Sequence, residues 1–185
     1  MNLEKMFEMQ KVLDERIIKE KGLEGQNLLP NLILALQVEL AECANEWRGF
    51  KHWSNDREPR ICVIDKKGQT EKEYYKNPLL EEYVDCLHFI LSIGNRLGWN
   101  DTDTIDDVVV QHLISEKGFD TAKTFSCLLS IAYGFHFSNV EKRTYISLFT
   151  TFFELGDKLG FKWEQIEAAY MEKNAVNHQR QQEGY

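Results

Sequence analysis

Two groups of acidic residues in this sequence have the types and the spacing of metal ligands. Glu39, Glu42 and Glu46 are three and four positions apart, so an α-helix would place their side chains along one face. Glu82 and Asp85 repeat the three-residue spacing further along the chain. If partly desolvated, two carboxylates about 4 Å apart repel by roughly 4 kcal/mol at an effective dielectric near 20, so we expect a cation beside them.

A single acidic pair of this kind is common on exposed helices and is ordinarily a solvated surface. Here each group borders a strongly apolar stripe, and antiparallel packing of the two helices would bring together the carboxylates of Glu39, Glu42, Glu82 and Asp85. Hard oxygen ligands suit Mg²⁺ or Mn²⁺ and not zinc. The sequence has no His/Cys set for zinc and neither a GxxxxGK[ST] nor a GxGxxG loop for phosphate.

Gln10 is the other residue that stands out, because its amide interrupts the apolar stripe of an amphipathic helix expected over residues 2–21. It has two interpretations: a boundary position half in water, or an amide that reads the hydrogen-bonding edge of a ligand, with Asp14 assisting one turn later. Lys51 lies between the aromatic residues Phe50 and Trp53, which suits a phosphate beside a stacked ring.

Helices must position these residues, and the apolar periodicity predicts an all-α fold, a multi-helix bundle. The expected helices cover residues 2–21, 28–48, 78–97, 104–117, 120–137, 139–159 and 162–182. We expect Gly49 to end the second helix and Ser138 to cap the sixth. Residues 60–76 carry the pattern of one small β-hairpin, with a strand at 61–64 and another at 70–75; the alternative is a loop.

Length and composition indicate one domain over residues 1–185. The 185 residues are 43% hydrophobic and 28% charged, as in a globular protein, and the net charge of −8 argues against a broad nucleic-acid-binding surface. An acidic protein still binds a phosphorylated ligand if a divalent metal bridges the negative charges. With no signal peptide and no apolar run of membrane-spanning length, we expect a cytoplasmic protein without a membrane partner.

The chain also contains an internal echo. Residues 93–99, IGNRLGW, are similar to residues 155–161, LGDKLGF. Each segment closes an apolar helix with glycine and an aromatic residue. A duplicated helical hairpin would explain the similarity, and so would chance.

Longer segments resemble a known family. Residues 39–54, ELAECANEWRGFKHWS, and residues 81–92, EEYVDCLHFILS, resemble the dimeric all-α dUTPases, a branch of the MazG-like all-α NTP pyrophosphatase superfamily with its ExxE…ExxD signature. Residues 173–185, KNAVNHQRQQEGY, resemble that family's KNxxNxxRQxxGY ending, and Gln10 fits its N-terminal glutamine. Residues 100–150 match no motif, and Asp14 stands where some relatives have Asn. A bacterial or bacteriophage member is expected.

The resemblance implies Mg²⁺-dependent hydrolysis of dUTP to dUMP and pyrophosphate, with Mn²⁺ as a substitute ion and dUDP as a further substrate to test. It implies that Glu39, Glu42, Glu82 and Asp85 are the metal ligands. Glu39 would be the general base for the attacking water, and Glu46 a second catalytic residue that orients it or adds a ligand. The implied substrate-binding residues are Gln10, Lys51, Trp53, His88, Phe89, Lys173, Asn174, Asn177, Arg180 and Tyr185.

Within this group Gln10 and Asn177 would bind the uracil edge, Phe89 would stack on the ring, and His88 would lie near the sugar. The expected assembly is a homodimer. Two alternatives stay open: a less selective house-cleaning nucleoside triphosphate pyrophosphatase, and a helical module that acts mainly through a protein partner. A protein regulator is the further partner to expect if the source is a phage.

Overall fold

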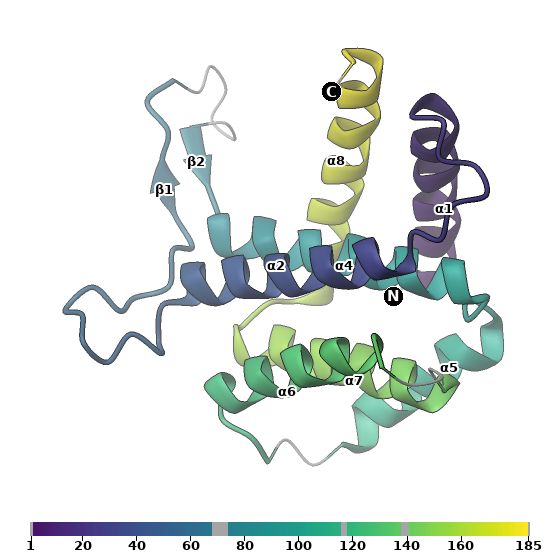
Figure 1. The fold of residues 1–185 in the computed structure, drawn as a ribbon. Helices are drawn as coiled ribbons and strands as arrows, with labels where there is room; N and C mark the ends of the chain where they lie inside the picture. The colour runs from purple at the N-terminus through teal and green to yellow at the C-terminus, as the bar shows by residue number, and fades with distance from the viewer. Residues whose placement is uncertain (1, 68–73, 116–117, 138–140, 185) are drawn as a thin grey trace.

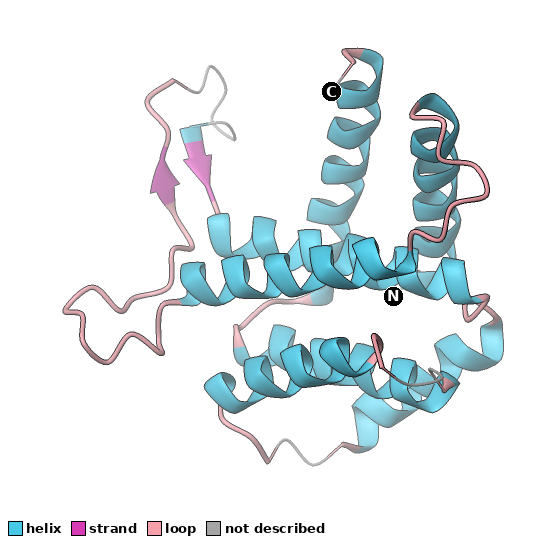
Figure 2. Ribbon diagram, in the orientation of Figure 1, coloured by secondary structure: helices cyan, strands magenta, loops and turns pink. Residues whose placement is uncertain are grey.

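The computed structural model describes residues 2–67, 74–115, 118–137 and 141–184, and these are helical apart from loops and one short two-stranded ribbon (Figures 1 and 2). The helices are α1 (Leu3–Glu20), α2 (Leu29–Trp47), α4 (Pro78–Leu97), α5 (Thr102–Ile114), α6 (Thr121–Gly134), α7 (Lys142–Lys158) and α8 (Trp163–Gln182). The predicted all-α class is confirmed, with helix ends within three residues of those expected.

The predicted hairpin is present but shorter than expected. Strand β1 (Val63–Ile64) pairs antiparallel with β2 (Tyr75–Lys76), with Val63 opposite Lys76. Residues 68–73, which include the last residue of the expected Lys-Lys-Gly turn and most of the expected second strand, lie outside the described residues, as does the expected Ser138 cap.

The helices form two layers with an upright pair on top. Helices α2 and α4 run antiparallel, side by side, and pack over α6 and α7 (Figure 1). Helices α1 and α8 stand next to each other on the opposite side of α4, and α5 packs against α7. Helix α4 therefore lies at the centre, in contact with α1, α2, α7 and α8.

Helix α4 is stable for local reasons as well as for its position. The side chain of Asn77 accepts a hydrogen bond from the backbone N–H of Leu80 at 3.1 Å, and Pro78 occupies the first turn, where no backbone donor is needed. From Leu79 to Gly94 most of its side chains are buried. Side chains on this helix are consequently held in place by packing on several sides, which favours a well-ordered site.

One apolar cluster joins the whole described structure, since every helix named above contributes buried side chains to it. Residues 100–150, which carry no recognised motif, supply part of this cluster through Val108 of α5, Phe125 and Leu128 of α6, and Phe149 of α7. Full burial of a side chain such as Leu or Phe contributes roughly 1.5–3 kcal/mol. This segment is therefore the support on which the α2–α4 layer lies. None of the described helices is both long enough and apolar enough to cross a membrane.

The end of α2 differs from the prediction that Gly49 terminates it. The helix ends at Trp47, and Arg48 is the residue in the left-handed conformation, with φ of 63°. Arg48 is held there by its guanidinium, which donates to the backbone carbonyl of Asp56 at 2.8 Å and pairs with the Asp56 carboxylate at 2.9 Å. Gly49 is required for another reason, because a Cβ at that position would collide with the Trp47 ring.

The internal echo corresponds to a reciprocal packing arrangement between α4 and α7. The Tyr83 hydroxyl of α4 donates to the carbonyl of Phe152 at 3.1 Å, and the Tyr145 hydroxyl of α7 donates to the carbonyl of Ile90 at 3.0 Å. Tyr145 and Phe152 repeat the spacing of Tyr83 and Ile90. Helix α6 packs against α7 as α2 packs against α4. Helix α5 likewise packs against α7 as α8 packs against α4. The packing is what a duplicated helical hairpin predicts.

Candidate active site

Three carboxylates meet where α2 and α4 run side by side. Glu39 and Glu42 of α2 and Glu82 of α4 each offer one oxygen within 4.8 Å of the others. The antiparallel packing of the two helices brings these side chains together, as the sequence predicted for separated acidic turns. Oxygen ligands grouped in this way suit a hard divalent cation.

Asp85, the fourth predicted ligand, lies beside the cluster but is paired with a lysine. Its Oδ2 accepts a hydrogen bond from the Lys173 ammonium of α8 at 2.5 Å, and both side chains are mostly buried. Asp85 is close enough to Glu39 and Glu82 that its charge raises the pKa of both carboxyl groups. The sequence placed Asp85 correctly but gave no reason to expect that Lys173 would bind it directly.

The electrostatics of the cluster favour a bound cation or a bound proton. Burial, and then the charges of Asp85, Glu39 and Glu42, raise the pKa of Glu82 from its usual 4.5 to about 7. Burial and the same group of neighbours raise the pKa of Glu39 as well. A hydrogen bond joins the Glu39 and Glu82 carboxyl groups, which requires a proton on one of them. Without a metal, the cluster therefore retains a proton near neutral pH.

Glu46 lies on the same face of α2 but makes a different contact. Its carboxylate accepts a hydrogen bond from Arg60 Nη1 at 3.2 Å, while its backbone carbonyl accepts from the Arg60 N–H at 3.0 Å. Glu46 thus holds the segment that leads into β1. Within the described residues, the carboxylates grouped for metal binding are those of Glu39, Glu42 and Glu82.

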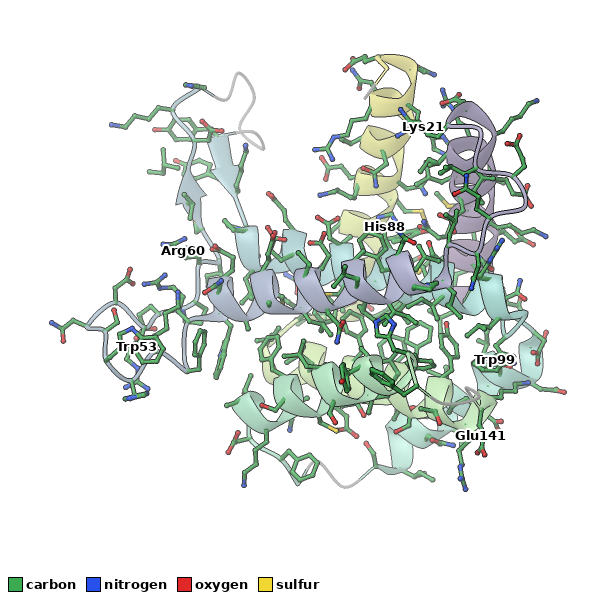
Figure 3. The ribbon with its side chains drawn as sticks, in the orientation of Figure 1. Lys21, Trp53, Arg60, His88, Trp99 and Glu141 are labelled. Carbon is green, nitrogen blue, oxygen red and sulfur yellow. The ribbon has the colours of Figure 1, made fainter. Side chains whose placement is uncertain are left out.

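A cavity of about 390 Å³ opens between α1, α4 and α8, with Leu28 and Leu32 at the start of α2 also in its lining. Four of the predicted substrate-binding residues line it: Gln10 of α1, His88 and Phe89 of α4, and Asn177 of α8. His88 lies one turn beyond Asp85 on α4, and Figure 3 shows it where α1 and α8 meet α4. A cavity of this size is adequate for a small ligand.

Gln10 is buried in the wall of this cavity, so its interpretation as a boundary position half in water is wrong. Only 3% of the residue is exposed. Its carbonyl oxygen lies 2.6 Å from His88 Nδ1 and 3.1 Å from the Tyr170 hydroxyl, and its amide nitrogen donates to Asp14 at 2.9 Å and to Ser92 at 3.0 Å. The amide therefore joins α1, α4 and α8 in one polar network.

His88 is neutral in this network. Burial, assisted by the Lys173 charge, lowers the pKa of His88 from 6.5 to about 3, and the imidazole stacks on the Tyr170 ring at 4.4 Å between centroids. Its Nε2 is buried and has no hydrogen-bond partner among the described residues. Because Nδ1 faces the carbonyl of Gln10, Nδ1 carries the proton and Nε2 is an acceptor.

Helix α8 presents a polar face to the same region. Lys173, Asn174 and Asn177 follow Tyr170 at helical spacing; Asn174 is buried and Asn177 lines the cavity. Burial raises the pKa of Asp85, and the charge of Arg180, which is exposed, is close enough to oppose this rise. The last predicted contact, Tyr185, lies outside the described residues.

Lys51 and Trp53 do not join the cavity. Lys51 Nζ lies 5.6 Å from the centre of the Phe50 ring, in a loop where Phe50 also stacks on Trp47. Trp53 is 68% exposed on the outer side of this loop, well separated from His88 (Figure 3). The predicted placement of a cation between aromatic residues is confirmed for Lys51 and Phe50, while a contact with substrate stays a prediction.

Three cavity-network residues were not anticipated: Ser92, Asn95 and Tyr170. Ser92 is the one polar residue within the apolar run from 89 to 93, and Tyr170 begins the polar face of α8. Both signals are visible in the sequence but are too common to identify a site without the tertiary structure.

The arrangement as a whole combines a cluster of cation-binding carboxylates, a buried lysine and a cavity with an aromatic wall and polar groups. It can hold a divalent cation, an anionic group and a flat polar ring next to one another. A family model described as dUTPase matches residues 2–185. Among the curated proteins, none matches this sequence.

Proposed function

The chain belongs to the dUTPase family and is a dUTP diphosphatase, and we propose that it releases dUMP and pyrophosphate with Mg²⁺ held by Glu39, Glu42, Glu82 and Asp85. The observation that carries this proposal is the grouping of three carboxylate oxygens within 4.8 Å on α2 and α4, two helices that also line the cavity. Family membership gives the reaction, and the position of the cluster supports these residues as the ligands.

The donor set fits Mg²⁺. All of the grouped atoms are carboxylate oxygens, and burial followed by the charges of Asp85, Glu39 and Glu42 raises the pKa of Glu82 to about 7, so a divalent cation would be stabilised beside these groups. Mn²⁺ accepts the same ligands and is the expected substitute. When bound, the ion would neutralise the triphosphate and lower the pKa of an attacking water.

Glu39 is the proposed general base. It is half-buried, and its carboxylate lies at the centre of the cluster, in contact with Glu82. A raised pKa brings a carboxylate closer to the operating pH, which makes it a better base for a water proton. The proton would be held on a Glu39 carboxylate oxygen and then passed to solvent. Glu46 is proposed to act indirectly, by holding Arg60 and the end of α2.

Substrate contacts follow from the placement of the side chains around the cavity. Phe89, half-buried in the wall, would stack on the base, while Gln10 and Asn177 lie where its polar edge would enter, and Asn174 supports this wall. His88 Nε2 would accept a hydrogen bond near the sugar. Lys173 and Arg180 are proposed to bind the phosphates, together with Lys51, Trp53 and Tyr185 from flanking segments.

Product analysis of dUTP hydrolysis in ¹⁸O-labelled water, with and without chelator, tests the proposal. We expect dUMP and pyrophosphate as products, activity that depends on Mg²⁺ or Mn²⁺, and little turnover of the four standard dNTPs. Equal turnover of all of these nucleotides would show a less selective pyrophosphatase. Assaying dUDP in parallel defines whether the third phosphate is required.

We propose a homodimer as the assembly. Leu34 and Val38, one turn apart on α2, are 58% and 46% exposed although they are apolar. Their burial against a second copy would remove apolar surface from water. Light scattering of the purified protein measures the mass directly, and a monomer at working concentrations contradicts this assignment.

A further inference from the structure

A second, smaller cavity lies where the end of α7 meets the first turns of α8. Its volume is about 60 Å³, which is room for roughly one or two molecules of the size of water. Helices α4, α5, α7 and α8 all contribute to its wall, and none of the lining residues has a part in the proposed reaction. The lining side chains are Tyr83, His112, Phe153, Asp157, Phe161, Trp163 and Ile166.

Most of this wall is aromatic, and its rings are held by one another. Phe153 packs edge-to-face against Trp163 with 5.5 Å between centroids, and Tyr83 packs in the same way against Phe161 at 5.3 Å. The indole N–H of Trp163 donates to the carboxylate of Glu167, which is not a lining residue, at 3.0 Å. Because the face of an aromatic ring carries partial negative charge, a wall of such rings favours a cation over an anion.

Asp157 and His112 add polar atoms to the aromatic wall. The side chain of Asp157 is 38% exposed, so the cavity can be entered from solvent, and its Oδ2 lies 3.5 Å from Nε2 of His112. Nδ1 of His112 is buried and has no hydrogen-bond partner among the described residues. Since Nε2 faces a carboxylate, Nε2 carries the proton and Nδ1 is an acceptor. A buried acceptor is costly without a donor, so this wall calls for one.

We propose that this cavity binds a primary ammonium group, from a small amine or from the end of a lysine side chain. Such a group has the positive charge that suits the rings and Asp157, and it has the N–H donors that suit the carboxylate and His112 Nδ1. Potassium has the charge but no donor, and water has the donors but no charge. A quaternary ammonium ion has no N–H and is too large for about 60 Å³.

The internal echo provides independent support for a ligand site at this place. In the aligned segments 93–99 and 155–161, Asp157 of α7 occupies the position of Asn95 of α4. Asn95 lines the larger cavity and Asp157 lines the smaller one, so each copy of the echo borders a cavity at the same residue. The neutral amide of the first copy is replaced by a carboxylate in the second, which changes the preferred ligand from a neutral polar group to a cation.

Titration of the whole chain with amines, followed by ¹H–¹⁵N NMR, tests this site. The indole N–H signal of Trp163, assigned by its loss in Trp163→Phe, reports on the cavity directly. The ligands are the chlorides of ammonium, methylammonium, tetramethylammonium and potassium, compared at equal ionic strength. We expect ammonium and methylammonium to bind with dissociation constants in the millimolar range. Potassium and tetramethylammonium should bind at least roughly tenfold more weakly, because neither has an N–H donor.

Three variants assign the binding to this cavity. Asp157→Asn keeps the shape and removes the charge, so it should weaken methylammonium binding by roughly ten- to a hundredfold. His112→Phe keeps an aromatic ring and removes the acceptor, which should weaken binding by roughly two- to tenfold. Asp106→Asn is the matched control, because Asp106 is exposed on α5 and does not line the cavity. Circular dichroism shows whether each variant is folded, and His112→Phe decides the outcome if Asp157→Asn is not.

Three results would overturn the assignment: no saturable shift with either amine, potassium binding as tightly as methylammonium, or full binding in a folded Asp157→Asn or His112→Phe variant. The first of these would mean that the cavity holds only water. N-α-acetyl-lysine amide then distinguishes the two sources of the ammonium group. Tighter binding than methylammonium would assign the site to a lysine side chain, and weaker binding would assign it to a small amine. These measurements involve no dUTP hydrolysis, so the proposed function stands or fails separately.

Discussion

The hydroxyl of Tyr83 lies directly over Gly156, so that a Cβ on this glycine would stand 2.5 Å from the tyrosine oxygen. The relationship is reciprocal, since Tyr145 lies over Gly94 in the same way. Each tyrosine also donates to a carbonyl of the opposite helix. Close approach of α4 and α7 therefore depends on two glycines and two buried hydroxyl groups.

The first prediction is that Gly156→Ala destabilises the protein by about 1–3 kcal/mol, because the added methyl overpacks a fully buried contact. Chemical denaturation measures this change. Tyr83→Phe alone should cost about 1 kcal/mol through the lost hydrogen bond.

The double variant is the control for this mechanism. Gly156→Ala combined with Tyr83→Phe should lower the free energy of unfolding by less than the sum of the two single substitutions, because removing the hydroxyl makes room for the methyl. Tyr145→Phe should give less relief to Gly94→Ala, since Phe7 Cε1 would still lie 2.8 Å from the new Cβ. Additive costs at Tyr83 and Gly156 would contradict the proposed contact.

The sequence was informative wherever short-range rules decide the structure. Helix α4 begins and ends at the predicted residues because Asn77, Pro78 and Gly98 each favour a helix terminus. The acidic spacing predicted the meeting of Glu39 and Glu82, because two amphipathic helices next to each other in the chain commonly pack antiparallel. These features require no knowledge of distant contacts.

Features set by long-range packing could not be predicted in this way. Lys173 is far from Asp85 in sequence, and only the docking of α8 on α4 brings them together. The saturation of Gln10 needs side chains from α1, α4 and α8 at once. Arg48 adopts the left-handed conformation that ends α2 and is held there by Asp56, whereas the sequence pointed to the neighbouring Gly49 as the residue that ends the helix.

The second prediction separates the two glutamates proposed for catalysis. Glu39→Gln should lower kcat for dUTP by about 10²–10⁴, because it removes a general base at the centre of the cluster. Glu46→Gln should lower kcat by less than about tenfold, since its partner is Arg60 and this ion pair is partly exposed. Steady-state kinetics at saturating Mg²⁺ measures both. A larger loss in Glu46→Gln than in Glu39→Gln would reverse these roles.

The third prediction concerns the Lys173–Asp85 pair. Lys173→Met should increase the affinity for Mg²⁺ in the absence of nucleotide, because a competing cation leaves Asp85. The same variant should raise KM for dUTP by roughly ten- to a hundredfold, through loss of a charge-assisted contact to phosphate. Calorimetric titration with Mg²⁺ and steady-state kinetics measure the two effects.

A lysine elsewhere provides a matched control for this variant. Lys142 pairs with Asp101 at 3.1 Å on the surface, so Lys142→Met should change neither quantity. If Lys173→Met weakened Mg²⁺ binding, Lys173 would instead be supporting the metal site.

The fourth prediction is that Mg²⁺ stabilises the protein more at pH 8 than at pH 6. The pKa of Glu82 is raised from 4.5 to about 7, so between these values the folded protein holds a proton that the unfolded chain has lost. Stability without metal therefore falls as the pH rises towards 7. Above pH 7 the cluster is ionised and free to bind Mg²⁺, which then stabilises the folded state by mass action.

Two other groups, Asp14 and His88, also make the stability of the folded protein depend on pH, in the range below about 6.5. The pKa of Asp14 is raised from 3.8 to about 6, so this residue also makes the folded state less stable as the pH rises towards 6. His88 has the opposite effect: its pKa is lowered to about 3 in the folded state, so the folded state becomes more stable as the pH rises towards 6.5. Thermal unfolding at pH 6 and pH 8, with and without Mg²⁺, measures the difference. In Glu82→Gln the dependence on pH should shrink, and an unchanged dependence would assign the bound proton to another group.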